Sequence, residues 1–281
     1  MKIFLTGGTG FIGSHFINSA IDSDIEIKAI KRSIKSIPKI KIQNNVEWLT
    51  KDFIDVSNSD LTGTDILVHL AAHSANVPYD TLENCIRYNV IEPLILFNKA
   101  KDAGVKKIIV TGSCFEYGTS GEKYDYIPAD APLDPTQSYP TSKAMASIAF
   151  KQFAIENKIQ LFYLRVFQVF GDGEADSRFW PSLRKAALSG EDFHMSFGEQ
   201  IRDFIEVNEL VKILISECRK IYSQKENIYK VSNVGTGNPQ SLIDFAKFWW
   251  KVWNAKGNLI VGTLPYRQGE IMRYVPLINN C

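Results

Sequence analysis

A glycine-rich turn at the start of the chain lies between a short apolar run and a helix-length amphipathic segment. Three glycines, three positions apart, follow the run at residues 3–6, and the segment 11–21 comes next. Residues without a Cβ atom allow backbone N–H groups and a helix N-terminus to approach a phosphate closely. We therefore expect this turn to bind the pyrophosphate of a dinucleotide. The residues expected to contact it are Gly7, Gly10, Phe11, Ile12 and Gly13.

Short apolar runs alternate with helix-length segments through the first half of the chain. Such alternation is typical of parallel strands that are buried on both faces and joined by helices. We expect an α/β fold with a Rossmann-type, doubly wound parallel sheet, whose ligands bind at the carboxyl ends of the strands. The expected strands are residues 3–6, 25–30, 46–49, 66–70, 107–111 and 161–166, and the expected helices include 11–21, 84–103 and 140–157.

Glycine and proline residues interrupt this alternation after about residue 166. Shorter elements between such residues are typical of a smaller lobe. We predict a dinucleotide-binding Rossmann domain at residues 1–166 and, at residues 167–281, mainly a substrate lobe. A helix-like segment and a strand-like run within residues 207–232 are expected to return to the main sheet.

Positive and negative charges are almost balanced along the chain. Its 281 residues carry 32 Lys and Arg against 31 Asp and Glu, a formal net charge of +1. A balanced chain has no general attraction for nucleic acid or for an anionic membrane, so an anionic ligand must be bound by a few well-placed cations. We expect a small-molecule partner, with no nucleic acid and no membrane.

The start of the chain and its cysteines indicate a cytoplasmic protein. A strand-like run follows Met1 at once and leaves no room for a secretory leader. No uninterrupted apolar stretch reaches the roughly 18 residues of a membrane helix. The cysteines lack the close spacing of a zinc or redox site, so we expect reduced thiols and no metal. They are Cys85, Cys114, Cys218 and Cys281.

Basic residues follow the second expected strand, where a dinucleotide fold contacts the adenosine ribose. Lys31 and Arg32 stand there, and no acid does. We favour NADP(H) over NAD(H), because an arginine can pair with a 2′-phosphate. A solvated basic loop is the alternative. The other residues expected along the dinucleotide are Asp52, placed to accept from the adenine amine, and the small turn Leu70, Ala71 and Ala72.

Tyr139 and Lys143 stand four positions apart, one helix after the expected strand that leads to Ser113. On a helix, this spacing places both side chains on one face. Proton transfer to or from an alcohol oxygen needs a phenol whose pKa lies nearer neutrality, and a nearby ammonium group lowers a phenol's pKa by favouring phenolate. The pair therefore has the composition of a general acid/base site.

The sequence resembles the extended short-chain dehydrogenase/reductase family, in its branch of sugar-nucleotide epimerases, dehydratases and reductases. The resemblance covers nearly the whole chain and rests on residues 6–13, 70–72 and 202–204, and on Asn89, Ser113, Tyr117, Gly118, Tyr139, Lys143, Arg267 and Glu270. It implies that Tyr139 is the general acid/base, that Lys143 lowers its pKa and binds the nicotinamide ribose, and that Ser113 hydrogen-bonds the reacting oxygen. It also implies a cofactor contact at Asn89.

The two positions after Ser113 narrow the choice among the reactions of the family. Family dehydratases carry an Asp-Glu pair there, whereas this chain has Cys114 and Phe115, so loss of water is not expected. The catalytic cysteine of the family's C3 and C5 epimerases aligns with Phe115. Cys114 is more in keeping with a small packing residue than with a catalyst. His194 is left open between an acid/base role and ordinary packing.

The remaining groups, Ser113, Tyr139 and Lys143, suffice for hydride transfer at one carbon. Residues 112–118 and 165–171 are similar to those of family reductases. We expect NAD(P)H-dependent reduction of a nucleotide-linked 4-keto-6-deoxyhexose at C4, with an NAD-dependent C4 epimerase as the runner-up. A dinucleotide-binding sensor without catalysis is a third alternative, against which the intact triad argues.

The resemblance also assigns substrate contacts. Arg202 and Arg267 match positions that hold the substrate diphosphate, with which arginine can form forked hydrogen bonds. Glu270 matches an acid that accepts from a ribose hydroxyl. Ser113 and Gln168 are expected to face the sugar, although Gln168 replaces the family's usual asparagine and puts detailed sugar contacts in doubt.

Two further expectations concern packing. Trp249, Trp250 and Trp253 have helical spacing and are expected to pack in a core or an interface rather than to stack on a base. The resemblance implies a homodimer in which the helices near residues 84–103 and 140–157 pair across the interface.

Overall fold

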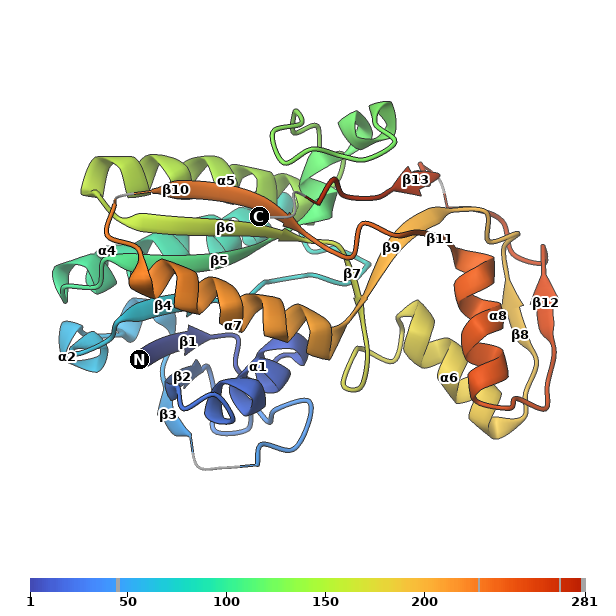
Figure 1. The fold of residues 1–281 in the computed structure, drawn as a ribbon, viewed down its shortest axis with the longest axis horizontal. Helices are drawn as coiled ribbons and strands as arrows, with labels where there is room; N and C mark the ends of the chain where they lie inside the picture. The colour runs from blue at the N-terminus through green and yellow to red at the C-terminus, as the bar shows by residue number, and fades with distance from the viewer. Residues whose placement is uncertain (44–45, 227, 268, 279–281) are drawn as a thin grey trace.

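A parallel sheet forms the centre of the molecule. The computed structural model describes residues 1–43, 46–226, 228–267 and 269–278. Within them, seven strands pair in the order β10-β6-β5-β4-β1-β2-β3, all parallel (Figure 1). The strands are β1 (Lys2–Thr6), β2 (Glu26–Lys31), β3 (Glu47–Thr50), β4 (Ile66–His69), β5 (Lys107–Ser113), β6 (Gln160–Val166) and β10 (Tyr229–Val234). The predicted doubly wound α/β fold is confirmed.

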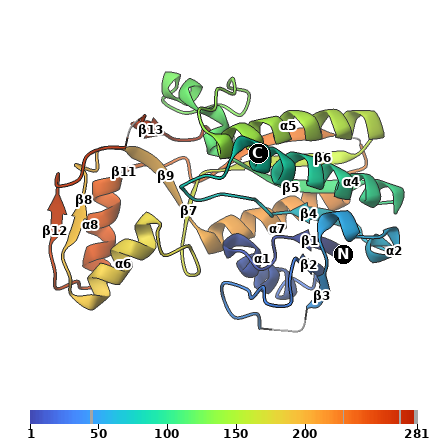
Figure 2. The same cartoon turned by 180° about the vertical axis from the view of Figure 1, so that it is seen from behind.

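Helices cover both faces of the sheet. One layer holds α1 and α7, which pack against each other, and the opposite layer holds α4 and α5 (Figures 1 and 2). Successive side chains of β1 serve the two layers: Ile3 and Leu5 belong to the core beneath α1 and α7, whereas Phe4 belongs to the core beneath α4 and α5. The helices are α1 (Phe11–Ile21), α4 (Glu92–Asp102), α5 (Ser138–Asn157) and α7 (Val207–Ser223).

The helical segment before α4 differs from the expectation of one helix over residues 84–103. It begins earlier, as α3 (Leu82–Ile86), and passes through a π-helical turn, η2 (Arg87–Ile91), before α4 starts. The buried Asn89 lies on this turn and is hydrogen-bonded to the backbone of a neighbouring loop. These tertiary hydrogen bonds accompany the local departure from α-helical geometry, which periodicity alone does not predict.

The second half of the chain contributes to two regions. α7 packs on α1, and β10 pairs with β6, so these two elements belong to the main sheet and its helical layer. The remaining elements form a lobe at one end of the molecule (Figure 1). They are β7 (Gln168–Phe170), α6 (Phe179–Ser189), β8 (Phe193–Met195), β9 (Ile201–Glu206), β11 (Pro239–Ser241), α8 (Leu242–Val252), β12 (Leu259–Val261) and β13 (Arg273–Tyr274). A division of the chain at residue 166 stays a prediction.

Aromatic side chains form much of the core of this lobe. Trp249 and Trp253 stack with ring centroids 5.2 Å apart, and Trp180 meets both rings edge-on. Trp250 packs beside Phe193. The tryptophans of α8 and its end therefore pack inside the lobe. None of the helices described is both long and apolar enough to cross a bilayer.

Short elements complete the chain between these regions. They are η1 (Phe53–Asp55), α2 (Asn58–Leu61), η3 (Cys114–Tyr117) and η4 (Thr119–Lys123). η3 follows β5 directly, so its residues stand at the carboxyl edge of the sheet, where the strands on both sides of β5 also end. Cys281 lies outside the described residues.

Candidate active site

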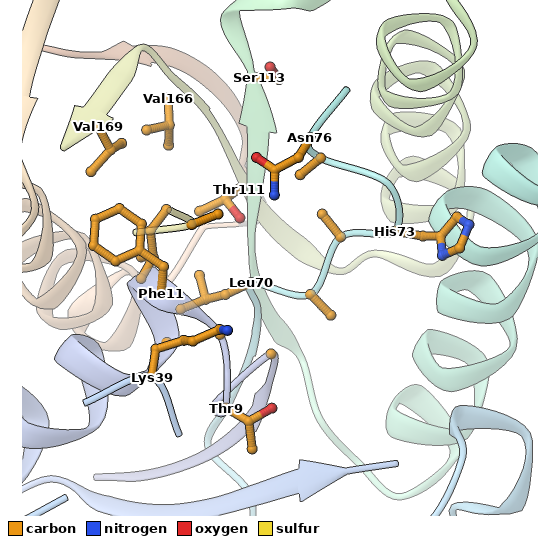
Figure 3. Close-up of a pocket in the computed structure, with 18 of the residues that line it drawn as sticks. Thr9, Phe11, Lys39, Leu70, His73, Asn76, Thr111, Ser113, Val166 and Val169 are labelled. Carbon is orange, nitrogen blue, oxygen red and sulfur yellow. The ribbon is translucent and has the colours of Figure 1, made fainter. Parts of the chain in front are cut away.

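A cavity of about 500 Å³ opens at the carboxyl edge of the sheet. The cavity begins at the glycine turn after β1. The order of the strands reverses beside this turn, between β1 and β4, and the cavity extends from there past β5 and β6 to the loop before α6. Figure 3 shows side chains from these separate segments facing one space. A doubly wound sheet places its ligands at this point, because the connections diverge there to opposite faces.

The glycines of the turn allow close backbone approaches on one side and leave space on the other. Gly7 has a φ of +76°, and a Cβ atom there would lie 2.6 Å from the Ala71 nitrogen. A Cβ atom at Gly13 would lie 2.1 Å from the Gly7 oxygen. At Gly10, by contrast, a Cβ atom would meet only that oxygen, at 3.1 Å. Gly10 lines the cavity at the N-terminus of α1, and no side chain caps this helix end. A pyrophosphate therefore fits against the backbone N–H groups of the first turn of α1.

The other residues expected to contact a dinucleotide are distributed along the same cavity. Those that line it are Phe11, Ile12, Lys31, Arg32, Asp52, Leu70, Ala71 and Ala72. Ser36 and Lys39 also line it and were not predicted, because in the sequence they belong to a basic run without a pattern. The side chain of Lys39 extends into the cavity in Figure 3.

Asn89 lies behind the cavity wall. Its Oδ1 accepts from the His73 N–H at 2.7 Å, and its Nδ2 donates to the His73 carbonyl at 3.1 Å and to the Ser142 hydroxyl at 2.9 Å. His73 lines the cavity, so Asn89 fixes the loop that does so. A direct cofactor contact at Asn89 stays a prediction.

Ser113, Tyr139 and Lys143 all line the cavity, although they come from two elements. Ser113 ends β5, whereas Tyr139 and Lys143 lie in the first two turns of α5. Lys143 is 3% exposed, and its Nζ donates to the Thr111 carbonyl at 2.7 Å. This hydrogen bond orients the ammonium group from the neighbouring strand. The three groups predicted to act together are therefore neighbours in space.

Burial dominates the pKa of Tyr139. It raises this pKa above its ordinary value, and the charges of Glu116 and Tyr79 add to the rise, while a hydrogen-bonding interaction with Ser113 opposes it. Tyr139 is therefore a phenol that carries its proton at neutral pH. A lowering of the Tyr139 pKa by Lys143 stays a prediction.

Tyr79 is a neighbour of the triad that the sequence did not reveal. Its ring centroid lies 5.4 Å from that of Tyr139, in a tilted arrangement. Burial raises the pKa of Tyr79, and the charges of Arg178 and Arg267 oppose that rise. Tyr79 thus marks where the catalytic groups meet a group of arginines.

The predicted substrate residues lie around this end of the cavity. Gln168 lines the cavity, whereas Arg202, Arg267 and Glu270 do not. Arg202 Nη2 lies 2.5 Å from Glu270 Oε1. Burial raises the pKa of the Cys114 thiol, and the charge of Arg202 opposes this rise, so Arg202 lies near the part of the cavity wall that Cys114 forms. Substrate contacts at these residues stay predictions.

A pair of charged residues in the cavity was missed by sequence reasoning. Arg178 lies at the N-terminus of α6, with Nη2 3.5 Å from Gln168 Oε1 and Nε 3.3 Å from Glu174 Oε1. Burial raises the pKa of Glu174 to about 7, and its Oε2 has no hydrogen-bond partner among the described residues. Both side chains lie in a loop region whose sequence carries no motif, so only the fold brings them to the cavity.

The two ambiguous residues have different surroundings. Burial raises the pKa of the Cys114 thiol to about 12, and the residue packs with Tyr117, Phe167 and Tyr274. Cys114 therefore carries a neutral thiol in an apolar cluster, as a packing residue does. His194 lies on β8 in the lobe, exposed, with Nδ1 3.2 Å from Thr263 Oγ1, and it does not line the cavity.

This chain is similar to a protein family and to several known proteins. The NAD dependent epimerase/dehydratase family matches residues 3–235. The CDP-abequose synthase of Salmonella muenchen is 27% identical over 96% of this chain and 87% of its own length. The UDP-glucose 4-epimerase of Lactobacillus helveticus is 26% identical over 87% of this chain and 79% of its own.

A solved structure extends the similarity to the whole fold. The UDP-N-acetylglucosamine 4-epimerase of Methanobrevibacter ruminantium M1, in complex with UDP-N-acetylmuramic acid, has a TM-score of 0.87 and 27% sequence identity, and the match covers 99% of this chain and 90% of that one. With most of the chain matched and with a glycine turn, serine, tyrosine and lysine around one cavity, the protein belongs to the NAD dependent epimerase/dehydratase family.

Proposed function

We propose that this enzyme reduces a nucleotide-linked 4-keto-6-deoxyhexose at C4, with Tyr139 as the proton donor. The observation that carries the proposal is the convergence of a protonated Tyr139 with Ser113 and Lys143 on the cavity that holds the glycine turn. A ketone oxygen takes up one proton when its carbon is reduced, and a buried phenol supplies it. The similarity to a CDP-abequose synthase supports a sugar nucleotide as substrate.

Each residue of the triad has a separate task in this reaction. The Ser113 hydroxyl and the Tyr139 phenol hydrogen-bond the carbonyl oxygen and so fix the carbon beside the cofactor. The Thr111 carbonyl holds Lys143, whose ammonium group stabilises negative charge that develops on the Tyr139 oxygen as the proton leaves. When bound, the reduced nicotinamide supplies the hydride.

Arginines account for binding of the diphosphate. A nucleoside diphosphate carries at least two negative charges, and guanidinium groups pair with phosphates through forked hydrogen bonds. Arg178 lines the cavity. The charge of Arg202 acts on Cys114, and the charge of Arg267 acts on Tyr79, so both arginines lie near this end of the cavity. Glu270, which contacts Arg202, is suited to accept from a ribose hydroxyl. We assign these four residues to the substrate nucleotide.

A C4 epimerase is the second candidate, and the named 4-epimerases among the similar proteins favour it. The same triad serves both reactions, since each moves a hydride and a proton at one carbon.

Glu174 bears on a third reaction, the loss of water. Cys114 and Phe115 replace the acid pair of the dehydratases, but Glu174 still adds one carboxyl group to the cavity. Product analysis must therefore also look for loss of water.

The preferred cofactor is proposed to be NADP(H). Lys31 and Arg32 line the adenosine end of the cavity, and Ser36 and Lys39 add polar groups beside them. No acid follows Lys31 directly at the end of β2, where one would accept from a 2′-hydroxyl.

The cytoplasm is proposed as the place of action. Cys85, Cys114 and Cys218 are free, buried thiols in the described part of the chain, which supports this proposal.

The enzyme is proposed to act as a homodimer through α4 and α5. Several apolar side chains are exposed on this layer and on the adjoining π-helical turn. A group of exposed apolar side chains is typical of a surface that binds another protein. They are Ile91, Ile95, Met145, Ile148 and Ile155. Burying such a face against its own copy would remove it from water.

Changing Tyr139 to phenylalanine should lower turnover by about a hundredfold or more, because only the proton donor is removed. Cofactor affinity should change little, since the ring remains. Initial rates measured beside a cofactor titration check this, with Tyr126→Phe as a control at an exposed tyrosine outside the cavity. Wild-type turnover in Tyr139→Phe would show that the proton comes from elsewhere.

Replacing Lys31 and Arg32 together by alanine should weaken NADPH binding by about 1–3 kcal/mol, because charge-assisted hydrogen bonds to the 2′-phosphate are lost. NADH binding should barely change. Fluorescence titration of both cofactors measures the difference, and Lys35→Ala, an exposed lysine that does not line the cavity, is the matched control. An equal loss for both cofactors, or a wild-type preference for NADH, contradicts the assignment.

Ile148→Asp should convert the protein to a monomer, because a carboxylate at the centre of an apolar interface stays desolvated and unpaired. Sedimentation velocity measures the mass. Leu188→Asp is the matched control, since Leu188 is also 64% exposed but lies on α6 in the lobe. A monomeric wild type, or a dimer that persists in Ile148→Asp, counts against this interface.

The reductase itself is tested with 4-deuterated NADPH and a 4-keto-6-deoxyhexose nucleotide. We expect NADPH to disappear in an amount equal to the product, with deuterium at C4, because a reductase consumes its cofactor in each turnover. Interconversion of a 4-hydroxy sugar nucleotide with its C4 epimer, without net cofactor consumption, would support the epimerase instead. Cofactor binding without turnover of any keto-sugar nucleotide would support the non-catalytic sensor.

A further inference from the structure

We propose that Glu116 is a positioning residue of the catalytic site: it joins the strand end that carries Ser113 to the helical turn that carries Lys143, and its negative charge acts on both Tyr139 and Lys143. Glu116 follows Ser113 by three positions and is fully buried. It does not line the cavity, and no motif used above assigns it. The inference rests on the proposed function and adds to it the origin of the triad's geometry and charge.

One carboxylate oxygen reaches both arms of the site. Glu116 Oε1 accepts from the Ser113 N–H at 2.8 Å and from the Tyr163 hydroxyl at 2.8 Å. The same Tyr163 oxygen lies 3.1 Å from the Lys143 carbonyl. Ser113 on β5 and Lys143 on α5 are therefore linked through three polar contacts, by way of two fully buried side chains.

The packing around this link is tight. A Cβ atom at Gly112 would lie 2.3 Å from the Tyr163 ring and 2.6 Å from Glu116 Oε1. The backbone of β5 thus runs directly against both side chains, which restricts their rotation. A fixed carboxylate can hold its partners in one geometry, whereas a mobile one cannot.

Glu116 forms a buried ion pair with Arg165. Arg165 Nε donates to Glu116 Oε2 at 2.7 Å, and Arg165 Nη1 donates to the Tyr117 oxygen at 3.1 Å and to the Ala129 carbonyl at 2.8 Å. Both carboxylate oxygens of Glu116 are therefore paired, and removing Arg165 alone would leave an uncompensated buried charge.

The charge of Glu116 acts in one direction on the catalytic groups. It raises the pKa of Tyr139, in the same sense as burial, and it raises the pKa of Lys143, against the lowering by burial. Both effects favour the protonated forms, a phenol and an ammonium group, from which a reduction begins. The titratable and charged groups that face Glu116 or its two targets are Tyr163 and Arg165 on β6, Cys114 and Tyr117 on η3, Tyr229 on β10, His69 on β4, and Tyr79.

Two variants separate the charge of Glu116 from its geometry. Glu116→Gln keeps the shape and removes the charge, so the alkaline limb of the rate profile against pH should move to lower pH by about one unit, since Tyr139 and Lys143 lose their protons more readily. Tyr163→Phe keeps the charge and removes the hydroxyl link, so the rate should fall roughly tenfold or more while the alkaline limb stays in place. Thermal unfolding and cofactor titration check that each variant folds.

A second readout needs no turnover. The NMR signal of the Lys143 side chain, labelled with ¹³C at Cε and assigned with Lys143→Met, should titrate at lower pH in Glu116→Gln than in the wild type. This shift would support the role of Glu116 even if the enzyme proved not to be a reductase, so the two proposals can fail separately. If Glu116→Gln does not fold, Glu116→Gln combined with Arg165→Gln removes both charges, and a smaller downward shift is expected, because the loss of the positive charge of Arg165 acts in the opposite direction.

Unchanged positions of the alkaline limb and of the Lys143 titration in the charge variants would overturn the electrostatic part of the inference. Wild-type rates in Tyr163→Phe would overturn the positioning part. A loss of rate in Glu116→Gln that is uniform across pH would reduce Glu116 to a residue of the folded core.

Discussion

Parallel pairing of β1, β4, β5 and β6 is the constraint on which the site depends. Because the four strands run in one direction, the glycine turn, the loop after His69, Ser113 and the segment after Val166 all meet at one edge. The close approach of Gly7 to Ala71 allows the turns after β1 and β4 to lie side by side. A side chain at Gly7 would collide with the backbone of Leu70 and Ala71 and would push the two turns apart.

Burial then determines the chemistry of the groups at that edge. A buried phenol, thiol or carboxylic acid retains its proton to higher pH, as Tyr139, Cys114 and Glu174 do. Behind the cavity, the buried charges of Arg165 and Glu116 form an ion pair. The site therefore combines neutral proton carriers at the cavity with ion pairs behind or beside it.

Reduction and epimerisation at C4 both move a hydride and a proton at one carbon, so the triad by itself does not select the reaction. Selection depends on how the sugar is oriented and on whether the cofactor leaves after each turnover. In this chain, residues near the triad that are not part of it include the arginines near Tyr79, the Glu174–Arg178 pair and Lys39, which lines the same cavity. They lie in loops and at element ends, where function varies most on a fixed scaffold.

The sequence by itself determined the α/β fold, most strand positions and the spacing of Tyr139 and Lys143, because these depend on local periodicity and on contacts within one helix or turn. It also located the glycine turn, whose backbone requirement excludes nearly all other residues. Tertiary structure alone decided that Asn89 holds a loop, that Arg178 and Glu174 face the cavity, and that Glu116 stands behind the triad. It also decided that Tyr139 is buried, which raises the pKa of its phenol. Burial and pairing of charges depend on residues distant in the sequence, and no local pattern records them.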